Sequence, residues 1–422
     1  MSDSLLIGLD LGTSGARVCV ITPEGALRSE GRAQMADFGN NIRDPYVWWK
    51  AASAALYQAL SSIDPRTIVA IAIDGTSGTM LPIDKKGKPL ALGRMYNDPC
   101  EDQATLKRIQ SIAPTQSAAH GPTSGLAKAI LFQTIPGVAA VIHQADWIAG
   151  QFSGTFVSDK NNALKTGYDP LSGTWPDWMQ ETGVQMNLLP RVFSAGDIVG
   201  PVTKDIANTF GFSTDMIVVA GTTDGCASFL ATGASETGDG VSALGTTLTL
   251  KILSDGPIFS PEFGVYSHKV LGKWLTGGAS NTGGNVLLAY FNADEIARLS
   301  AQIDPDSPCD LDYYPLVKPG ERFPFADPAL SPVLEPRPES DIDFFKGMLD
   351  GIAHIEQAGF DRMHKLGGPK LRTLRTVGGG ADNQAWTRMR KNLLDVPFLP
   401  VASKEAAYGT ALLALHGIER AK

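Results

Sequence analysis

Short apolar runs that end in polar, glycine-bearing loops recur along this chain. In residues 5–17, LLIGLDLGTSGAR, one apolar run ends at Asp10 and the next begins at Val18. The turn between them is made of two glycines and two hydroxyl residues, Gly12, Thr13, Ser14 and Gly15. The pattern predicts a strand, a tight polar turn and a second strand. Uncovered N–H groups and hydroxyls in such a turn suit the oxygens of a polyphosphate, although an ordinary hairpin explains the stretch equally well.

The next predicted elements are a helix and a buried strand. Asp44-Pro45 predicts a helix start, with Asp as N-cap and Pro in the first turn, and apolar residues then recur at helical spacing as far as Ile63. Residues 67–73 form a continuous apolar run, which is typical of a strand buried on both faces. The run ends in the polar loop 74–79. Ligands bind at such strand ends in open α/β sheets, and a purely structural turn is the alternative.

Two more loops carry polar side chains. Tyr96-Asn97-Asp98 places an amide and a carboxylate where they could reach the hydroxyls of a polyol. After helices expected over 126–134 and 138–152, a buried strand over 216–220 leads through a Gly-Thr-Thr turn to Asp224, near the start of a helix. A carboxylate at a helix start is stabilised in its ionised form by the helix dipole. An ionised, fixed carboxylate can act as a general base.

The second half of the chain repeats the plan of the first. Residues 242–247, SALGTT, enter a new apolar run just as the first Leu-Gly-Thr turn does, and residues 219–224 resemble residues 376–382. The chain therefore reads as a diverged duplication. We expect domains over residues 1–232 and 233–404, with a helix at about 405–422 that could pack back on the first domain.

Late in the chain, three glycines precede a helix that contains Trp386. Gly378, Gly379 and Gly380 would let a flat ring or a ribose approach the backbone, and Asn383 could bond the edge of the ring. A plain glycine-rich turn is the alternative. Before this motif, the proline-rich segment 304–340 predicts an ordered loop, because its aromatic residues need burial, or else a flexible linker. Those aromatic residues are Tyr313, Tyr314, Phe323 and Phe325.

Composition narrows the class of protein. The 422 residues are 43% hydrophobic and 19% charged, as in a globular protein of two domains. The net charge of −8 argues against nucleic acid or an anionic membrane as partner. The four cysteines, Cys19, Cys100, Cys226 and Cys309, show no metal-site spacing and fit reduced thiols in the cytosol. We expect no signal peptide and no membrane span, hence a cytoplasmic protein. Neither Gly-Lys pair is followed by Ser or Thr, so a P-loop is not expected.

Taken in order, the motifs resemble those of the FGGY carbohydrate kinases, which belong to the actin-like ATPase superfamily. The resemblance rests on Leu9-Asp10-Leu11-Gly12-Thr13, Gly221-Thr222-Thr223-Asp224, Leu244-Gly245-Thr246-Thr247 and Gly378-Gly379-Gly380-Ala381. It implies an α/β fold with two ribonuclease-H-like domains flanking a central cleft. Within the family, the chain is similar to the short cyanobacterial and plant branch called xylulose-kinase-like, whose members resemble D-ribulose kinases. Segments such as IDGTSGT and QADW carry that likeness.

The resemblance also implies roles for individual residues. Asp10 would organise Mg²⁺ and lie near the sugar, and Asp224 would be the base. The expected sugar ligands are Asp10, Ser77, Asn97, Asp98 and Asp224. The expected ATP ligands are Thr13, Ser14, Arg17, Gly245, Thr246, Gly379, Gly380, Asn383 and Trp386. Because the second hairpin has Ala243 where the first has Asp10, metal chemistry should lie in the first domain.

The sequence thus predicts an ATP- and Mg²⁺-dependent kinase that moves the γ-phosphoryl group to the terminal hydroxyl of a ketopentose, D-ribulose first. D-xylulose or another polyol is the second choice of substrate. An actin-like or Hsp70-like ATPase without a sugar substrate is the rival from another class. The expected partners are the sugar and ATP, without nucleic acid or membrane, and the expected state is a monomer or a weak homo-oligomer.

Overall fold

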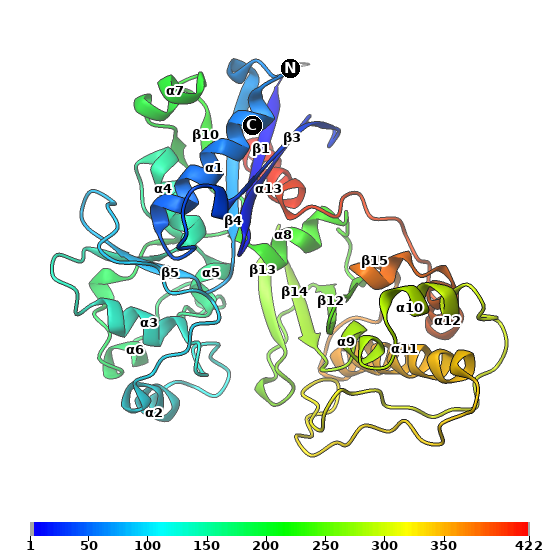
Figure 1. Ribbon diagram of the computed structural model, residues 1–422. Coiled ribbons are helices and arrows are strands. Elements are labelled where there is room, and N and C mark those ends of the chain that lie inside the picture. Colours follow the sequence, from blue (N-terminus) through cyan, green and yellow to red (C-terminus); the bar gives the residue numbers. More distant parts are fainter. Residues whose placement is uncertain (1–3, 421–422) are drawn as a thin grey trace. The chain divides into compact units, whose positions relative to one another are not determined.

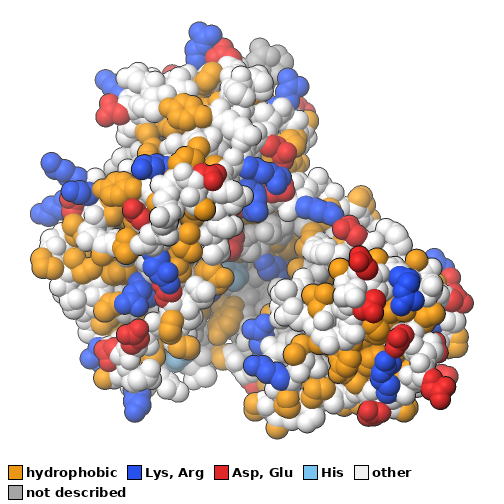
Figure 2. Space-filling model, in the orientation of Figure 1, with side chains coloured by type: hydrophobic (Ala, Val, Ile, Leu, Met, Phe, Trp, Pro, Cys, Tyr) orange, Lys and Arg blue, Asp and Glu red, His pale blue; other side chains and the backbone are white. Residues whose placement is uncertain are grey.

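The computed structural model describes residues 4–420, which fold into two compact units (Figure 1). Unit 1 contains the described residues as far as Ala231, together with His268–Gly272 and the segment from Glu405 onwards. Unit 2 contains Thr232–Ser267 and Lys273–Lys404. Acidic and basic side chains are interspersed over the face seen in Figure 2. Within residues 4–420, no helix has the length and apolar character that a membrane crossing requires.

Unit 1 is built on a six-stranded sheet with the order β3-β2-β1-β4-β10-β9. Its strands are β1 (Leu5–Leu11), β2 (Gly15–Ile21), β3 (Leu27–Gln34), β4 (Ile68–Gly75), β9 (Ile198–Pro201) and β10 (Ile217–Thr223). The central strands β1, β4 and β10 are parallel to one another. In this register Asp10 lies opposite Asp74, and Asp74 lies opposite Thr222. The carboxyl ends of the three strands therefore meet at one edge of the sheet.

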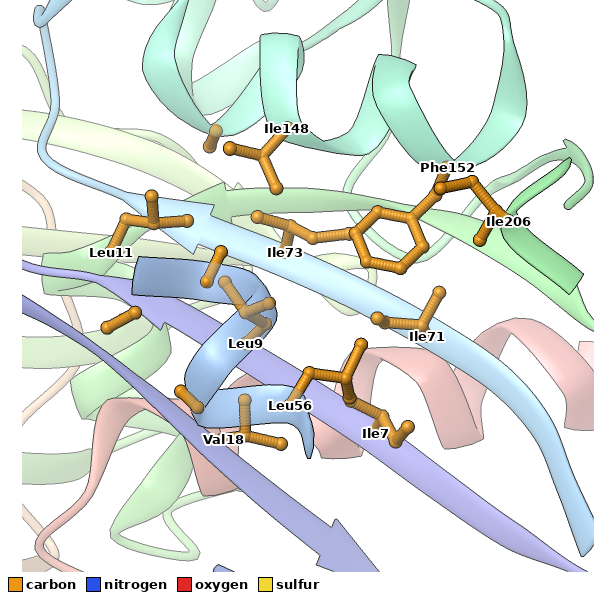
Figure 3. Packing of buried hydrophobic residues seen from close by; sticks show 14 of the residues in the cluster. Ile7, Leu9, Leu11, Val18, Leu56, Ile71, Ile73, Ile148, Phe152 and Ile206 are labelled. Carbon is orange, nitrogen blue, oxygen red and sulfur yellow. The ribbon is translucent and has the colours of Figure 1, made fainter. Parts of the chain in front are cut away.

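Helices cover both faces of this sheet. On one face, α1 (Pro45–Leu60) and α4 (Gln144–Ser153) close a core that includes Ile7, Leu9 and Leu56 (Figure 3). The opposite face packs against α13 (Ala406–Arg420), which also contacts α8 (Asp224–Ala231). The contact with α13 requires a glycine, because a Cβ atom on Gly8 would lie 1.9 Å from the carbonyl oxygen of Ala407. Side chains alternate along β1, so Asp10 points to the same face as Gly8.

The rest of unit 1 consists of short elements, and several of them share a second core that includes Leu126 and Met179. They are β5 (Met80–Ile83), α2 (Gln103–Ile112), α3 (Gly125–Phe132), β6 (Ala140–His143), β7 (Ser158–Asp159), α5 (Lys160–Leu164), α6 (Trp178–Glu181), β8 (Val192–Phe193) and α7 (Lys204–Phe210). The helix expected over 138–152 begins only at Gln144. The prediction is wrong for residues before Gln144, because Ala140–His143 forms a strand that pairs with β5. Helical periodicity in the sequence does not reveal such a partner strand.

A second sheet, with the five-strand order β13-β14-β12-β11-β15, belongs to unit 2 apart from the residues of β13 from His268 onwards. The strands are β11 (Asp239–Leu244), β12 (Leu248–Ser254), β13 (Tyr266–Val270), β14 (Lys273–Ala279) and β15 (Thr373–Val377). The helices are α9 (Gly284–Leu288), α10 (Ala293–Ser300), α11 (Asp341–Lys365) and α12 (Gln384–Leu394). Buried side chains of α11 such as Phe345 and Ile352 share a core with Leu250 and Ile252 of β12.

Sheet order corrects one part of the expected duplication. The hairpin β11–β12 matches β1–β2, and β15 lies parallel to β11 as β4 lies parallel to β1. The counterpart of β15 is therefore β4, and the glycine loop after β15 corresponds to the loop 74–79. The likeness of residues 376–382 to 219–224 was misleading, because both segments are strands that end in glycines and an acid, and sequence does not show which neighbour each strand has.

The proline-rich segment is an ordered loop within unit 2. Short bridges join Tyr314 to Val333 and Glu321 to Asp327, and Tyr313 and Phe323 are buried. Phe325 is 42% exposed, contrary to the expectation that it needs burial. Its ring instead lies beside the ring of Tyr314 and the guanidinium group of Arg362, which cover part of its surface.

Candidate functional site

Two carboxyl groups lie side by side at the carboxyl edge of the unit 1 sheet. Asp10 and Asp74 are each the last residue but one of their strands, β1 and β4, and both side chains are buried. Asp74 Oδ2 accepts a hydrogen bond from the Thr410 hydroxyl on α13. Asp74 also shares a hydrogen bond with the side chain of Asp10. A hydrogen bond between two carboxyl groups requires a proton on one of them, so the two side chains act as a pair.

Burial and neighbouring groups change the pKa values of Asp10 and Asp74 to different extents. Burial, together with the charge of Asp10, raises the pKa of Asp74 well above its usual range. Burial also raises the pKa of Asp10, but interactions with Asp74 and with Arg17 oppose that rise. Arg17 Nη1 lies 3.3 Å from Asp10 Oδ2, and Arg17 also faces Glu405 at 3.6 Å. The carboxyl group of Asp74 therefore holds a proton more strongly than that of Asp10.

Asp224 adds a third carboxyl group to this edge. It follows β10 directly as the first residue of α8, and its Oδ1 accepts a 2.6 Å hydrogen bond from the backbone N–H of Gly225. The charge of Asp224 raises the pKa of Asp74. It also opposes the lowering of the pKa of Lys165 that burial causes. The carboxylate is thus close to both groups, at the positive end of a helix dipole.

Hydrogen bonds within the loop and from Lys128 hold the loop that carries Ser77 in place. Thr76 Oγ1 and Thr79 Oγ1 share a 2.6 Å hydrogen bond. The buried Lys128 on α3 donates to the carbonyl oxygens of Gly78 at 2.8 Å and Met95 at 2.7 Å, so it joins this loop to the segment containing Asn97 and Asp98. Ser77 Oγ is enclosed and has no partner among residues 4–420. A hydroxyl held in this way is ready to pair with a ligand.

The other two expected sugar ligands are placed differently. Asn97 is exposed. The carboxylate of Asp98 receives hydrogen bonds from Arg43 at 2.6 and 3.2 Å and from the backbone N–H of Met95 at 2.8 Å. Asp98 therefore organises its own loop in this structure, and a sugar-binding role for either residue stays a prediction.

The two hairpins expose the groups that were expected to contact phosphate. In unit 1, Thr13 and Ser14 are exposed at the turn, which a 3.0 Å bond from Gly12 N to Gly15 O closes. In unit 2, the start of α9 supports the second turn, where Gly284 N donates to Gly245 O at 2.8 Å and Asn285 N to Thr246 O at 3.1 Å.

A cavity of about 730 Å³ opens in unit 2. Six residues that the sequence proposed for ATP line it: Gly245, Thr246, Gly379, Gly380, Asn383 and Trp386. Helices α9 and α10 supply an apolar wall that includes Leu287, Ile296 and Ala297. Sequence reasoning missed this wall. The capping box of α10, with Asn292 and Glu295, could have predicted where this helix begins. It could not have predicted that the helix faces the glycine loop before α12.

Two of the six residues support the cavity rather than project into it. The Trp386 ring is buried, and its Nε1 donates to Leu349 O at 2.9 Å. Asn383 caps α12, since its Oδ1 accepts from Trp386 N at 2.9 Å while its Nδ2 donates to Ser300 Oγ at 2.8 Å. The amide of Asn383 thus already has hydrogen-bond partners within the protein, without the expected bond to the edge of a nucleotide ring.

Comparison with known proteins decides the family. Residues 5–117 and 131–231 match the N-terminal domain of the FGGY family of carbohydrate kinases, and residues 240–418 match its C-terminal domain. The chain belongs to the FGGY family of carbohydrate kinases. As an FGGY kinase it is an ATP-dependent phosphotransferase, and the α/β fold of two domains expected for the family is confirmed.

The relatives of this FGGY kinase are distant but cover nearly the whole chain. The xylulose kinase of Escherichia coli is 23% identical over 91% of this chain and 84% of its own length. The autoinducer-2 kinase of Yersinia enterocolitica is 22% identical over 99% and 87%. Among solved structures, the xylulose kinase of Rhodospirillum rubrum has a TM-score of 0.81 at 21% identity, over 97% and 89%. Plasmodium falciparum glycerol kinase with ADP has a TM-score of 0.81 at 14% identity, over 99% and 90%. These structural likenesses show the fold.

Proposed function

We propose that this FGGY kinase phosphorylates the terminal hydroxyl of a ketopentose, with D-ribulose as the preferred substrate. The observation that carries the proposal is the cluster of Asp10, Asp224 and the partnerless Ser77 hydroxyl at one edge of the unit 1 sheet. The two carboxylates accept hydrogen bonds from sugar hydroxyls, and Ser77 can donate or accept. A small sugar rich in hydroxyls matches this set.

In the proposed mechanism, Asp224 is the general base. It accepts the proton of the terminal hydroxyl while the hydroxyl oxygen forms a bond to the γ-phosphorus of ATP. The bond between that phosphorus and the bridging oxygen breaks, and ADP leaves. Phosphoryl transfer depends mainly on positioning and on the neutralisation of charge. The fixed position of Asp224 at the start of α8 therefore supports its proposed role as the base.

The nucleotide is proposed to lie in the cavity of unit 2. The apolar wall of α9 and α10 and the glycines before α12 suit the purine and ribose. The exposed hydroxyl groups of Thr13 and Thr246, together with Arg17, are proposed to contact the phosphates. A site that is mostly apolar, with a few polar groups, is the usual form of a cofactor pocket.

The residues at the Asp10 corner fit a Mg²⁺ ion. Among the described residues, no three acidic, His or Cys side chains gather as a complete ligand set. Mg²⁺ needs no such set, because it keeps several waters and takes one or two carboxylates plus substrate phosphates. The buried side chain of Asp10, at the carboxyl end of β1, has the carboxyl chemistry that Mg²⁺ accepts. Asp10 would hold the ion, whose charge neutralises the phosphates.

A pentulose screen tests the proposal. ADP release from ATP and Mg²⁺ should be stimulated most by D-ribulose, when it is compared with D-xylulose, ribitol and glycerol. D-xylulose is the second candidate because several relatives are named xylulose kinases. A higher rate with glycerol would contradict the ketopentose assignment, and ADP release that no sugar stimulates would favour an actin-like ATPase. The cytoplasmic location and the weakly oligomeric or monomeric state expected from the sequence remain predictions.

A further inference from the structure

One cation near the proposed sugar site has no role in the chemistry described so far. Lys165 follows α5 directly, and its Nζ lies 3.5 Å from the carbonyl oxygen of Ser77. That distance is at the limit of a hydrogen bond. An ammonium group has three donors, so this contact leaves it able to bind a ligand.

The backbone around Lys165 is held firmly against the catalytic edge of the sheet. Asn161 Nδ2 donates to Thr222 Oγ1 at 2.9 Å, and Asn162 Nδ2 donates to Thr222 O at 3.2 Å. Thr222 lies two residues before Asp224. The carbonyl oxygen of Lys165 also accepts from Gly125 N at 3.2 Å. The position of Lys165 relative to Asp224 is therefore set by the fold and not by a flexible loop.

Lys165 is accessible to solvent, but protein atoms also surround part of its side chain. The residue is exposed to solvent, yet desolvation by surrounding protein lowers the pKa of Lys165, while the charge of Asp224 raises it. A freely solvated surface lysine would show neither effect. The side chain passes over Gly78, where an added Cβ would lie 3.7 Å from Lys165 Cδ. A small molecule beside Ser77 and Asp224 would meet this ammonium.

The chemistry of a ketopentose supplies a matching group. D-ribulose closes its ring through the terminal hydroxyl, so transfer to that hydroxyl requires the open chain, in which the carbonyl is free. A carbonyl oxygen can only accept hydrogen bonds, and the carboxylates proposed at Asp10 and Asp224 can only accept as well. The carbonyl therefore needs a different partner. Arg17 is paired with Asp10 and Glu405 and is proposed to contact the phosphates. Of the donors that remain, the Ser77 hydroxyl and the Lys165 ammonium, Lys165 carries a charge and has three N–H groups.

We infer that Lys165 binds the carbonyl oxygen of the open-chain ketose and thereby selects a ketose over the corresponding polyol. The inference rests on the proposed function, because it assumes that the sugar lies between Ser77 and Asp224. Lys165 is then a residue that touches the substrate and orients its terminal hydroxyl toward Asp224, without taking part in the proton transfer.

Three variants test this role. Lys165→Met removes the ammonium and keeps most of the stem, Lys165→Arg keeps a cation, and Lys160→Met removes a charge from the other end of α5. The ammonium of Lys160 makes no hydrogen bond or ion pair with any residue in the described range. KM for D-ribulose and for ATP should be measured, together with calorimetric binding of D-ribulose and of ribitol, in which the carbonyl is reduced to a hydroxyl.

Lys165→Met should weaken D-ribulose binding about 10- to 100-fold, the usual range for a hydrogen bond to a charged group, and leave KM for ATP unchanged. Ribitol binding should fall much less. Lys165→Arg should recover most of the D-ribulose affinity, and Lys160→Met should match the wild type. An unchanged KM for D-ribulose in Lys165→Met, or equal losses for both sugars, would overturn the inference while the kinase proposal stands. A wild type inactive with every ketopentose would instead contradict the proposed function.

Discussion

The Thr410 hydroxyl donates a hydrogen bond to Asp74 Oδ2 across 336 positions of sequence. Thr410 lies on α13, near the end of the chain, and Asp74 lies on the central strand β4 beside Asp10. Both side chains are fully buried. The C-terminal helix thus holds a carboxyl group next to the residue proposed to bind the metal. The proposed catalytic edge of unit 1 therefore depends on a segment that follows all of unit 2 in sequence.

Replacement of Thr410 by Val should destabilise the protein. Val has nearly the same shape but no hydroxyl, so it removes the donor to the buried Oδ2 of Asp74, which costs about 1–3 kcal/mol. Urea unfolding of Thr410→Val should show this loss. Thr410→Ser keeps the donor and is the matched control. Equal stabilities of the Val and Ser variants would mean that the bond contributes nothing.

Two neighbouring glycines in the unit 2 cavity should behave differently when changed to Ala. A Cβ on Gly380 would lie 2.7 Å from the Trp386 ring and 2.8 Å from Leu244 Cβ, whereas a Cβ on Gly379 would meet nothing within 4 Å. Gly380→Ala should therefore lower stability by about 1–3 kcal/mol, as overpacking does. Gly379→Ala should leave stability unchanged but raise KM for ATP, because its methyl group occupies space proposed for the nucleotide.

Thermal unfolding and ATP kinetics of the two variants separate these outcomes. Each variant serves as the control for the other, since both add one methyl group within the same turn. If Gly379→Ala binds ATP as well as the wild type does, the nucleotide does not approach this glycine.

The buried Asp159 should make stability depend on pH. Burial, and then the charge of Asp146, raises the pKa of Asp159 to about 7. In the unfolded chain an Asp loses its proton near pH 4, so between about pH 4 and about pH 7 the folded state binds more protons. Stability from this group is therefore full at the acid end and is lost as the pH rises through about 7.

Asp159→Asn removes this titration. The wild type should lose about 1–4 kcal/mol relative to Asp159→Asn as the pH is raised from about 5 to about 8, as measured by urea unfolding at each pH. Asp215→Asn is the control, because Asp215 is exposed and should show no such difference. Parallel pH curves for wild type and Asp159→Asn would contradict the raised pKa.

Sequence predicted those parts of the site that are local in the chain. The hairpin at Thr13, the helix cap at Asp44 and the position of Asp224 at a helix start all depend on a few consecutive residues, and the structure has each of them. Asp74 lay within a loop of interest, but its pairing with Asp10 depends on strand register. The contact with Thr410 depends on where a distant helix packs.

The same limit explains the other omissions. Sequence analysis did not single out Lys165, because its closeness to Ser77 and Asp224 arises from hydrogen bonds between α5 and β10. The cavity of unit 2 needed α9 and α10 to face the glycine loop. Spacing within one element says which residues share a face, but it does not say what that face meets.

The last prediction concerns the proposed base. Asp224 follows a buried strand, accepts a hydrogen bond from Gly225 N and begins α8, so its carboxylate has a fixed direction. Asp224→Asn keeps the shape and an acceptor for that bond but cannot take a proton. A positioned base typically contributes about 10²–10⁴-fold, and sugar phosphorylation should fall by that factor. Nucleotide affinity should be nearly kept, because the lining of the proposed nucleotide cavity does not include Asp224.

The alternative is that Asp224 only stabilises the start of its helix. Asn is as good a residue as Asp at a helix start, so in that case the Asn variant should turn over nearly as fast as the wild type. Asp205→Asn, in the first turn of α7, is the matched control for loss of a carboxylate at a helix N-terminus. Steady-state kinetics together with a nucleotide titration of both variants decide the matter: a large fall in turnover confined to Asp224→Asn, with nucleotide binding intact, assigns the proton to Asp224, and near wild-type turnover removes it from the mechanism.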